Sequence, residues 1–189
     1  MTGHAIILVG VSSVGKTSVS EQLQLELREP YLHVAVDHFF SMFPHEWRDH
    51  PRQPGPGFWV EECVDPDGSP RARIRYGEAG SRLLAGMRAA VKALLATGNN
   101  VILDEMPIDD SIVPAWRREL RATSSLWVRL TASLPVLEQR ERSRTRGQQL
   151  GNARGHLDVP VGNRWDLVLD TDHLSAAQSA TRILKALDL

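Results

Sequence analysis

The chain of 189 residues has one cysteine, few lysines and no long apolar segment. The single cysteine, Cys63, excludes an internal disulfide and is typical of a protein in a reducing compartment. No apolar run approaches the roughly 20 residues that cross a bilayer. The apolar stretch Ala5–Val9 is also too short for a signal peptide. We therefore expect a cytoplasmic protein without a membrane partner.

The charge and the histidine spacing exclude two further classes. The net charge of −1 argues against a protein that coats nucleic acid. The seven histidines form no H-x-x-x-H pair and have no cysteine partners, so we expect no zinc site. The length predicts a single domain over residues 1–189. The sequence does not indicate an oligomeric state, and a homodimer or a higher oligomer is left open.

The strongest motif follows the first apolar run. Residues 4–9 predict a buried strand, and Gly10–Thr17 then match the phosphate-binding pattern G-x-x-x-x-G-K-[ST]. Backbone N–H groups of such a loop bind phosphate oxygens. Its lysine, here Lys16, contacts the β- and γ-phosphates, and its hydroxyl residue, here Thr17, holds Mg²⁺. The cofactors predicted are ATP and Mg²⁺. The predicted nucleotide contacts in the loop are Gly10, Val11, Ser12, Ser13, Val14, Gly15, Lys16, Thr17 and Ser18.

Strand and helix patterns alternate along the rest of the chain. This alternation predicts an α/β fold, a three-layer sandwich with a five-stranded parallel sheet of the P-loop NTPase, nucleotide-kinase-like type. Further strands are expected at 32–36, 101–105, 126–130 and 167–170. Helices are expected near 16–28, 77–98, 109–122, 135–144 and 175–187, with Gly98 ending the second and Ser175 capping the last.

An insertion over residues 44–76 interrupts the alternation. Within it, 58–64, the turn 65–68 and 71–75 predict a β-hairpin. Aromatic side chains concentrate in and just before this insertion. They either form the wall of an acceptor site or the core of a small subdomain, and the sequence favours neither. The candidate substrate contacts are Phe39, Phe40, Phe43, Phe58 and Trp59.

Carboxylates follow two of the predicted strands. Parallel strands place their carboxyl ends at one edge of the sheet, where ligands gather. Asp37 is the candidate general base that accepts a proton from an acceptor hydroxyl. Its alternatives are holding a Mg²⁺-bound water or capping a helix. Asp104 is the candidate metal ligand, and Glu105 a weaker candidate for metal or substrate contact.

Four arginines crowd the end of the predicted helix 135–144 and the residues that follow. A lid over 144–160 would bring arginines to the transferred phosphoryl group, and Arg140, Arg144 and Arg146 are the candidates. The alternative is a solvated charged face. Nucleic-acid binding is disfavoured because aromatic residues do not alternate with these arginines.

The chain resembles the chloramphenicol phosphotransferase-like P-loop kinases nearly end to end. The resemblance implies ATP-dependent phosphorylation of a small-molecule hydroxyl, with Lys16 on phosphate and Asp37 as base. It further implies adenine contacts near Thr171 and an antibiotic as acceptor. The residues that carry it are Ile6-Ile7-Leu8, Gly10, Ser12-Ser13, Gly15-Lys16, Pro30, Val36-Asp37, Asp65–Gly68, Ile102-Leu103-Asp104, Trp127-Val128, Glu138, Arg140-Glu141, Trp165-Asp166 and Asp170-Thr171.

Two other functions are consistent with the motifs. A metabolite kinase of the shikimate, gluconate or nucleotide type shares the core, but its substrates require clustered basic residues at the acceptor. A nucleotide-dependent switch needs no small-molecule acceptor. The GTPase motif N-K-x-D is absent, since Asn163–Asp166 reads N-R-W-D.

Overall fold

One parallel sheet organises the chain in the computed structural model, which describes residues 2–48, 50–51, 55–145 and 149–187. Its strand order is β2-β6-β1-β7-β8, and every neighbouring pair is parallel. The predicted five-stranded parallel sheet is therefore confirmed. The strands are β1 (Ala5–Val9), β2 (Tyr31–Ala35), β6 (Asn100–Glu105), β7 (Ser125–Thr131) and β8 (Leu167–Asp170).

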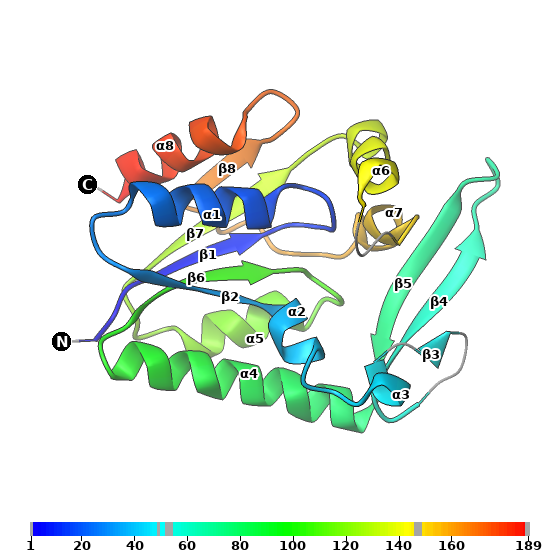
Figure 1. The fold of residues 1–189 in the computed structure, drawn as a ribbon, viewed down its shortest axis with the longest axis horizontal. Coiled ribbons are helices and arrows are strands. Elements are labelled where there is room, and N and C mark those ends of the chain that lie inside the picture. Colours follow the sequence, from blue (N-terminus) through cyan, green and yellow to red (C-terminus); the bar gives the residue numbers. More distant parts are fainter. Residues whose placement is uncertain (1, 49, 52–54, 146–148, 188–189) are drawn as a thin grey trace.

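Helices cover both faces of this sheet, which confirms the three-layer sandwich (Figure 1). One face carries α1 (Lys16–Glu26) and α8 (Ala176–Ala186), and the other carries α4 (Glu78–Ala96) and α5 (Ile112–Glu119). Alternate residues of a strand point to opposite faces. Ile6 and Leu8 accordingly pack in the core under α1 and α8, and Ile7 in the core under α4 and α5. A central strand between two helical layers is apolar throughout for this reason.

The predicted ends of the main elements lie close to those observed, and two predicted helix ends are confirmed. Gly98, at a φ of 89°, follows α4 and donates its N–H to the Leu95 carbonyl at 3.1 Å. The Ser175 hydroxyl caps α8 by accepting the Gln178 N–H at 3.2 Å. One boundary was wrong. Val36 does not end β2 but begins the short helix α2 (Val36–Phe40), which places Asp37 in a helical first turn.

The insertion forms a second, smaller sheet beside α4. The hairpin is confirmed as β4 (Phe58–Val64) and β5 (Pro70–Tyr76), with an antiparallel register that pairs Trp59 with Arg75. Periodicity did not predict α3 (His45–Arg48) or β3 (His50–Pro51), which pairs parallel with β4. Both are too short for a periodic pattern to register.

A short helix, α7 (Asn152–His156), follows α6 (Leu134–Ser143) and docks on the hairpin. The Ala72 N–H donates to the Gly151 carbonyl at 2.9 Å, and the Ile74 N–H donates to His156 Nε2 at 3.1 Å. A Cβ on Gly155 would lie 1.8 Å from the Ala72 carbonyl oxygen, so only glycine allows this approach. The predicted lid region thus contains a helix packed against β5.

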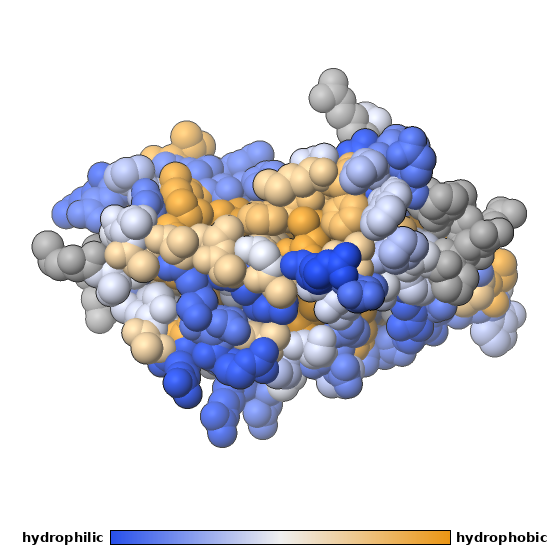
Figure 2. All heavy atoms as spheres, turned by 90° about the horizontal axis from the view of Figure 1, so that it is seen from below, coloured by the Kyte–Doolittle hydropathy of each residue, from blue (hydrophilic) through white to orange (hydrophobic). Residues whose placement is uncertain are grey.

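The outward face of α4 is partly apolar. Figure 2 views the molecule from this side and shows a band of apolar surface that hydrophilic side chains flank and interrupt. The exposed residues of α4 include Ala85, Ala89 and Ala93, whose small side chains favour helix formation. Within the described residues, no helix combines the length and apolar character that crossing a membrane requires.

Candidate active site

The loop between β1 and α1 has the backbone conformation of a phosphate-binding turn. Gly15 has a φ of 99°, a left-handed conformation that glycine adopts without strain, and α1 begins at the next residue. Ser13 also has a positive φ, at 62°. The first N–H groups of α1 have no partner inside the helix and point toward the space over the loop. Such a helix start attracts anions.

Lys16, Thr17 and Asp104 form a polar cluster where β1 and β6 end. The Thr17 hydroxyl donates to Asp104 Oδ2 at 2.8 Å, and Lys16 Nζ lies 3.7 Å from Asp104 Oδ1. Lys16 Nζ also donates to the Val11 carbonyl at 3.1 Å. Burial raises the pKa of Asp104, but Lys16, His33 and Thr17 together hold that pKa below its usual range. The carboxylate is therefore ionised at neutral pH.

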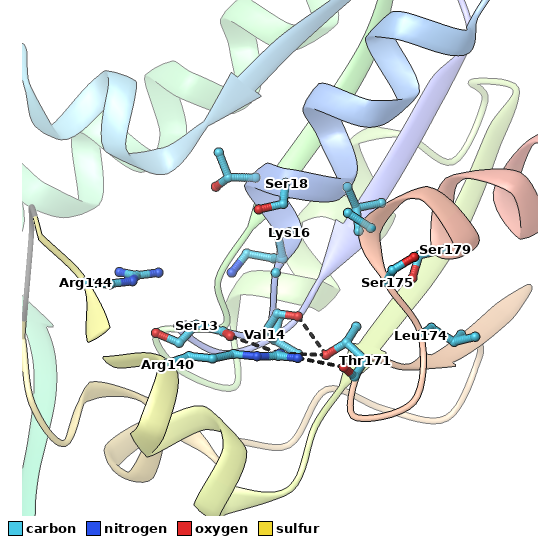
Figure 3. A pocket seen from close by; sticks show the side chains of 14 residues that line it. Ser13, Val14, Lys16, Ser18, Arg140, Arg144, Thr171, Leu174, Ser175 and Ser179 are labelled. Carbon is cyan, nitrogen blue, oxygen red and sulfur yellow. Dashed lines mark hydrogen bonds between the residues drawn. The ribbon is translucent and has the colours of Figure 1, made fainter. Parts of the chain in front are cut away.

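A cavity of about 410 Å³, named here the loop cavity, lies over the start of α1 (Figure 3). It is lined by the loop, by two arginines of the α6 end and by the segment that follows β8. Every predicted nucleotide contact from Ser13 to Ser18, and Thr171, is among its lining residues. The lining is Ser13, Val14, Gly15, Lys16, Thr17, Ser18, Val19, Arg140, Arg144, Thr171, Leu174, Ser175, Ala176 and Ser179.

Arg140 links two walls of the loop cavity. Its guanidinium donates to the Thr171 carbonyl at 2.6 Å and to the Thr171 hydroxyl at 3.0 Å (Figure 3). The Thr171 hydroxyl lies 2.9 Å from the Val14 carbonyl. Arg140 thus holds the segment after β8 against the loop. Arg144 is exposed and makes no such anchor among the described residues, and the predicted Arg146 lies outside them.

A second cavity of about 500 Å³, named here the hairpin cavity, adjoins the first. Lys16, Thr17 and Arg144 line both, so the two spaces meet at the head of α1. Its other walls come from α2, the hairpin and the α7 region. The remaining lining residues are Ser12, Ala35, Val36, Asp37, Phe40, Ser41, Arg48, Phe58, Trp59, Val60, Ile74, Asp104, Met106, Gln149 and Asn152.

Asp37 lines the hairpin cavity from the first turn of α2 and is exposed. Its backbone carbonyl accepts the Ser41 N–H at 3.1 Å, but its carboxylate has no hydrogen-bond partner among the described residues. The helix-cap alternative for this side chain is therefore not what the structure shows. The carboxylate is available to a ligand in the hairpin cavity.

The predicted aromatic contacts divide into two groups. Phe40, Phe58 and Trp59 line the hairpin cavity. Phe39 and Phe43 do not line it: both pack against the core under α4, and their predicted contact with a substrate stays a prediction. The Phe43 and Phe58 rings meet edge to face with centroids 5.7 Å apart. Both alternatives left open by the sequence therefore apply, because Phe58, at 3% exposed, is at once core and cavity wall.

Glu105 lines neither cavity, and its predicted contact with metal or substrate stays a prediction. The side chain is 1% exposed, and its carboxylate accepts hydrogen bonds from Trp116 Nε1 and from the Met106 N–H. Burial raises its pKa to about 7. Gly10 and Val11 line a third cavity of about 230 Å³, and their predicted contact with a nucleotide stays a prediction.

Several lining residues of the hairpin cavity escaped sequence reasoning. Asn152 and Gln149 approach from the α7 region, and Arg48 from α3. Asn152 and Arg48 belong to short helices without a periodic pattern, and Gln149 lies outside any helix or strand. The sequence signal for α7 was the glycine of the Gly151-Asn152 pair. Gly151 has a φ of 83° at the start of this helix, a conformation that favours glycine.

The donor set at Thr17 and Asp104 fits Mg²⁺. This ion prefers oxygen ligands and usually combines one or two carboxylates with substrate phosphates. The Thr17 hydroxyl and the ionised Asp104 carboxylate supply two such ligands at the edge of the loop cavity. Among the described residues, no group of three or more His, Cys, Asp or Glu side chains gathers to hold a metal by itself. The residues therefore fit a cation shared with bound phosphates.

Several solved structures share this fold. APS kinase CysC of Mycobacterium tuberculosis, in complex with AMPPNP and APS, superposes with a TM-score of 0.70 at 14% identity, over 100% of this chain and 99% of that one. A sugar kinase from Janibacter sp. superposes with a TM-score of 0.66 at 18% identity, over 100% of this chain and 95% of that one. The tunicamycin resistance protein of Deinococcus radiodurans superposes with a TM-score of 0.56 at 18% identity, over 98% of this chain and 96% of that one.

Sequence comparison is more specific. Relatives from two strains of Mycobacterium tuberculosis, each named "Putative O-phosphotransferase", are 30% identical over 104 residues, which is 55% of this chain and 46% of each relative. The aligned part thus spans about half the length of these curated relatives. A family model described as "Chloramphenicol phosphotransferase-like protein" matches residues 3–188. The chain therefore belongs to the chloramphenicol phosphotransferase-like protein family.

Proposed function

We propose that this protein is an ATP-dependent O-phosphotransferase that moves the γ-phosphoryl group to a hydroxyl of a small molecule. One observation carries the proposal: the loop cavity and the hairpin cavity adjoin, and both are lined by Lys16, Thr17 and Arg144. A nucleotide in the first cavity would point its terminal phosphate into the second. The family and the names of the curated relatives agree with an alcohol as acceptor.

At the nucleotide end, this chain's own groups bind and orient the phosphates. Backbone N–H groups of the loop and the start of α1 face the anion, and Lys16 adds a positive charge. Thr17 and Asp104 would hold Mg²⁺, which would neutralise part of the charge of the bound phosphates. Arg144 faces both cavities and stabilises the charge that develops on the transferred group. Arg140 keeps the wall formed by Thr171 in place.

At the acceptor end, Asp37 acts as general base. Its carboxylate takes the proton of the acceptor hydroxyl as the hydroxyl oxygen bonds to the γ-phosphorus. The bond from that phosphorus to the bridging oxygen of ADP breaks, and ADP leaves with the electron pair. The products are ADP and a phosphate monoester.

Phe40, Phe58, Val60, Ile74 and Met106 give the hairpin cavity an apolar part beside its polar lining, and this part suits an acceptor that has an apolar portion. An antibiotic-like alcohol has this character, and phosphorylation of its hydroxyl would add charge and inactivate it. We therefore include antibiotic resistance or self-protection in the proposal. A polar metabolite is the competing acceptor.

The test is the substitution Asp37→Asn, with Asp110→Asn as matched control on an exposed turn outside both cavities. ADP release is measured with chloramphenicol and other uncharged alcohols, and separately with gluconate and APS. We expect Asp37→Asn to lower acceptor-dependent turnover by at least about 100-fold, with an unchanged Kd for AMP-PNP. Normal turnover in that variant, or ATP turnover that no acceptor changes, contradicts the proposal.

A further inference from the structure

Two buried polar atoms at the hairpin cavity have no hydrogen-bond partner among the described residues. They are Nε1 of Trp59 and Oδ1 of Asn152. Both side chains line the cavity, and Asn152 as a whole is 8% exposed. The other polar atom of Asn152, Nδ2, makes one long hydrogen bond, to Gln149 Oε1 at 3.4 Å. A polar atom that is buried without a partner destabilises the fold, so such atoms at a cavity point to a ligand.

The backbone that carries Asn152 is firmly held. Its carbonyl lies 2.8 Å from His156 Nδ1, whose ring also accepts the Ile74 N–H. The Glu141 carboxylate accepts the N–H groups on either side of Asn152, from Gly151 at 2.9 Å and Ala153 at 2.6 Å. The start of α7 is therefore fixed against the hairpin and α6. The Asn152 side chain is presented to the cavity from a rigid support, as a recognition contact requires.

Trp59 lines the same cavity from the hairpin. It lies in β4, in register with Arg75 of β5 and with His50 of β3. Its indole N–H can only donate, and the Asn152 Oδ1 can only accept. A ligand that satisfies both must accept one hydrogen bond and donate one. An uncharged hydroxyl or carboxamide does this, whereas a carboxylate, sulfate or phosphate cannot donate to Asn152.

The charges of the cavity point the same way. Lys16 and Arg144 line the junction with the loop cavity, and Asp104 pairs with Lys16 there, where the proposed function places the phosphates. Beyond that junction the charged lining residues are Asp37 and Arg48, one of each sign. The acceptor end thus carries no excess of positive charge for an anionic substrate.

We infer that Trp59 and Asn152 form a recognition subsite for an uncharged hydroxyl or carboxamide of the acceptor, separate from the hydroxyl that is phosphorylated. This inference rests on the proposed function, which places the hydroxyl to be phosphorylated beside Asp37. The subsite selects neutral acceptors over anionic ones that share the same alcohol chemistry. It involves binding only, so it acts on acceptor affinity and not on the nucleotide.

Calorimetry on Trp59→Phe and Asn152→Leu tests the subsite, with AMP-PNP and Mg²⁺ present. Both variants remove the polar atom and keep most of the side-chain volume, and Trp47→Phe, outside the cavity lining, is the matched control. The probes are chloramphenicol and other uncharged alcohols with an amide or second hydroxyl, set against gluconate and APS. We expect neutral probes to bind about five-fold more weakly to each variant, with an unchanged Kd for AMP-PNP. Unchanged affinity, or binding of the anionic probes alone, overturns the inference.

Thermal unfolding without ligand gives an answer that depends on no probe. Because the two atoms are unpaired in the free protein, Trp59→Phe and Asn152→Leu should leave Tm unchanged or raise it. A fall of several degrees in both would mean that the atoms serve the fold, and would overturn the inference. The outcomes also separate the two proposals. Neutral probes that bind through Trp59 but are never phosphorylated contradict only the proposed function. Phosphorylation with unchanged KM in both variants contradicts only the subsite.

Discussion

The two adjoining cavities are built in different ways. The loop cavity depends on a contiguous motif at the end of β1, reinforced by one anchor from Arg140 to Thr171. The hairpin cavity depends on segments far apart in the chain, since α2, β4 and α7 meet only after the hairpin and α7 dock. The proposed phosphate site thus depends mainly on one local motif, and the proposed acceptor site depends on tertiary packing. The difference implies that changes at one end should leave binding at the other end intact.

Lys16→Met separates the two ends with the largest expected effect. The variant keeps the length of the side chain and removes the charge beside Asp104 and the bound phosphates. We expect phosphoryl transfer to fall by about 10²–10³-fold, while the Kd of a neutral probe in the hairpin cavity stays the same by calorimetry. Lys92→Met, which removes only an exposed pair with Glu119, is the control. Equal loss of acceptor binding would show that the ends are not independent.

Arg140 and Arg144 should differ in kind. Arg144→Ala is expected to lower kcat by about 10²-fold with little change in the KM for ATP. Arg144 lines both cavities, and its side chain holds no other described segment in place. Arg140→Ala should mainly raise the KM for ATP, because it releases Thr171 from the loop. Steady-state kinetics with varied ATP distinguishes them. The reverse pattern would exchange the two roles.

Gly155→Ala tests the docking of α7 on the hairpin. A Cβ there would lie 1.8 Å from the Ala72 carbonyl, so the backbone must shift, at a cost of about 1–3 kcal/mol in stability. We expect a higher KM for the acceptor and an unchanged Kd for AMP-PNP. A raised Kd for AMP-PNP in this variant would show that the docking also supports the nucleotide end.

Gly86→Ala is the matched control for that substitution. A Cβ at Gly86 would meet no neighbouring side chain or segment within 4 Å, and the residue lies in the exposed interior of α4. Alanine there should stabilise the protein by about 0.5–1 kcal/mol, because glycine loses more backbone entropy on folding. Both KM values should stay unchanged.

The smallest expected effect is a pH dependence of stability that arises where α7 docks on the hairpin. Burial lowers the pKa of His156 below its ordinary value of 6.5, and its Nε2 accepts the Ile74 N–H, so the folded protein keeps it neutral. The unfolded chain binds the proton at a higher pH, so this contribution to stability is full above pH 6.5 and is lost as the pH falls below it. His156→Gln should flatten the fall in Tm between about pH 7.5 and 5.5. His173→Gln, on an exposed histidine, should keep the original slope.

The sequence predicted what local patterns determine. The order of strands and helices, the loop at Gly10–Thr17 and the position of Asp104 follow from apolar periodicity and one motif. It failed where long-range packing decides. Asp104 and Glu105 are both buried at the end of β6, but Asp104 lines the hairpin cavity whereas Glu105 accepts a hydrogen bond from Trp116. The neighbouring positions point to opposite faces of the sheet, and only the covering helices decide which face is open.

The acceptor wall shows the same limit. Residue type could not distinguish Phe40, which lines the hairpin cavity, from Phe39 and Phe43, because all three pack against the same core. Asn152 was invisible because α7 has five residues and its position depends on contacts with β5. Composition indicated an aromatic region, and docking selected which of its side chains reach the cavity.

The central claim is that an alcohol in the hairpin cavity lies beside Asp37 while the nucleotide fills the loop cavity. A crystal structure with AMP-PNP, Mg²⁺ and the neutral probe that binds most tightly tests it directly. The account predicts an acceptor hydroxyl about 2.6–3.2 Å from an Asp37 carboxylate oxygen, on the side that faces the γ-phosphate. An acceptor bound outside the hairpin cavity, or an Asp37 carboxylate turned away from it, would contradict the account.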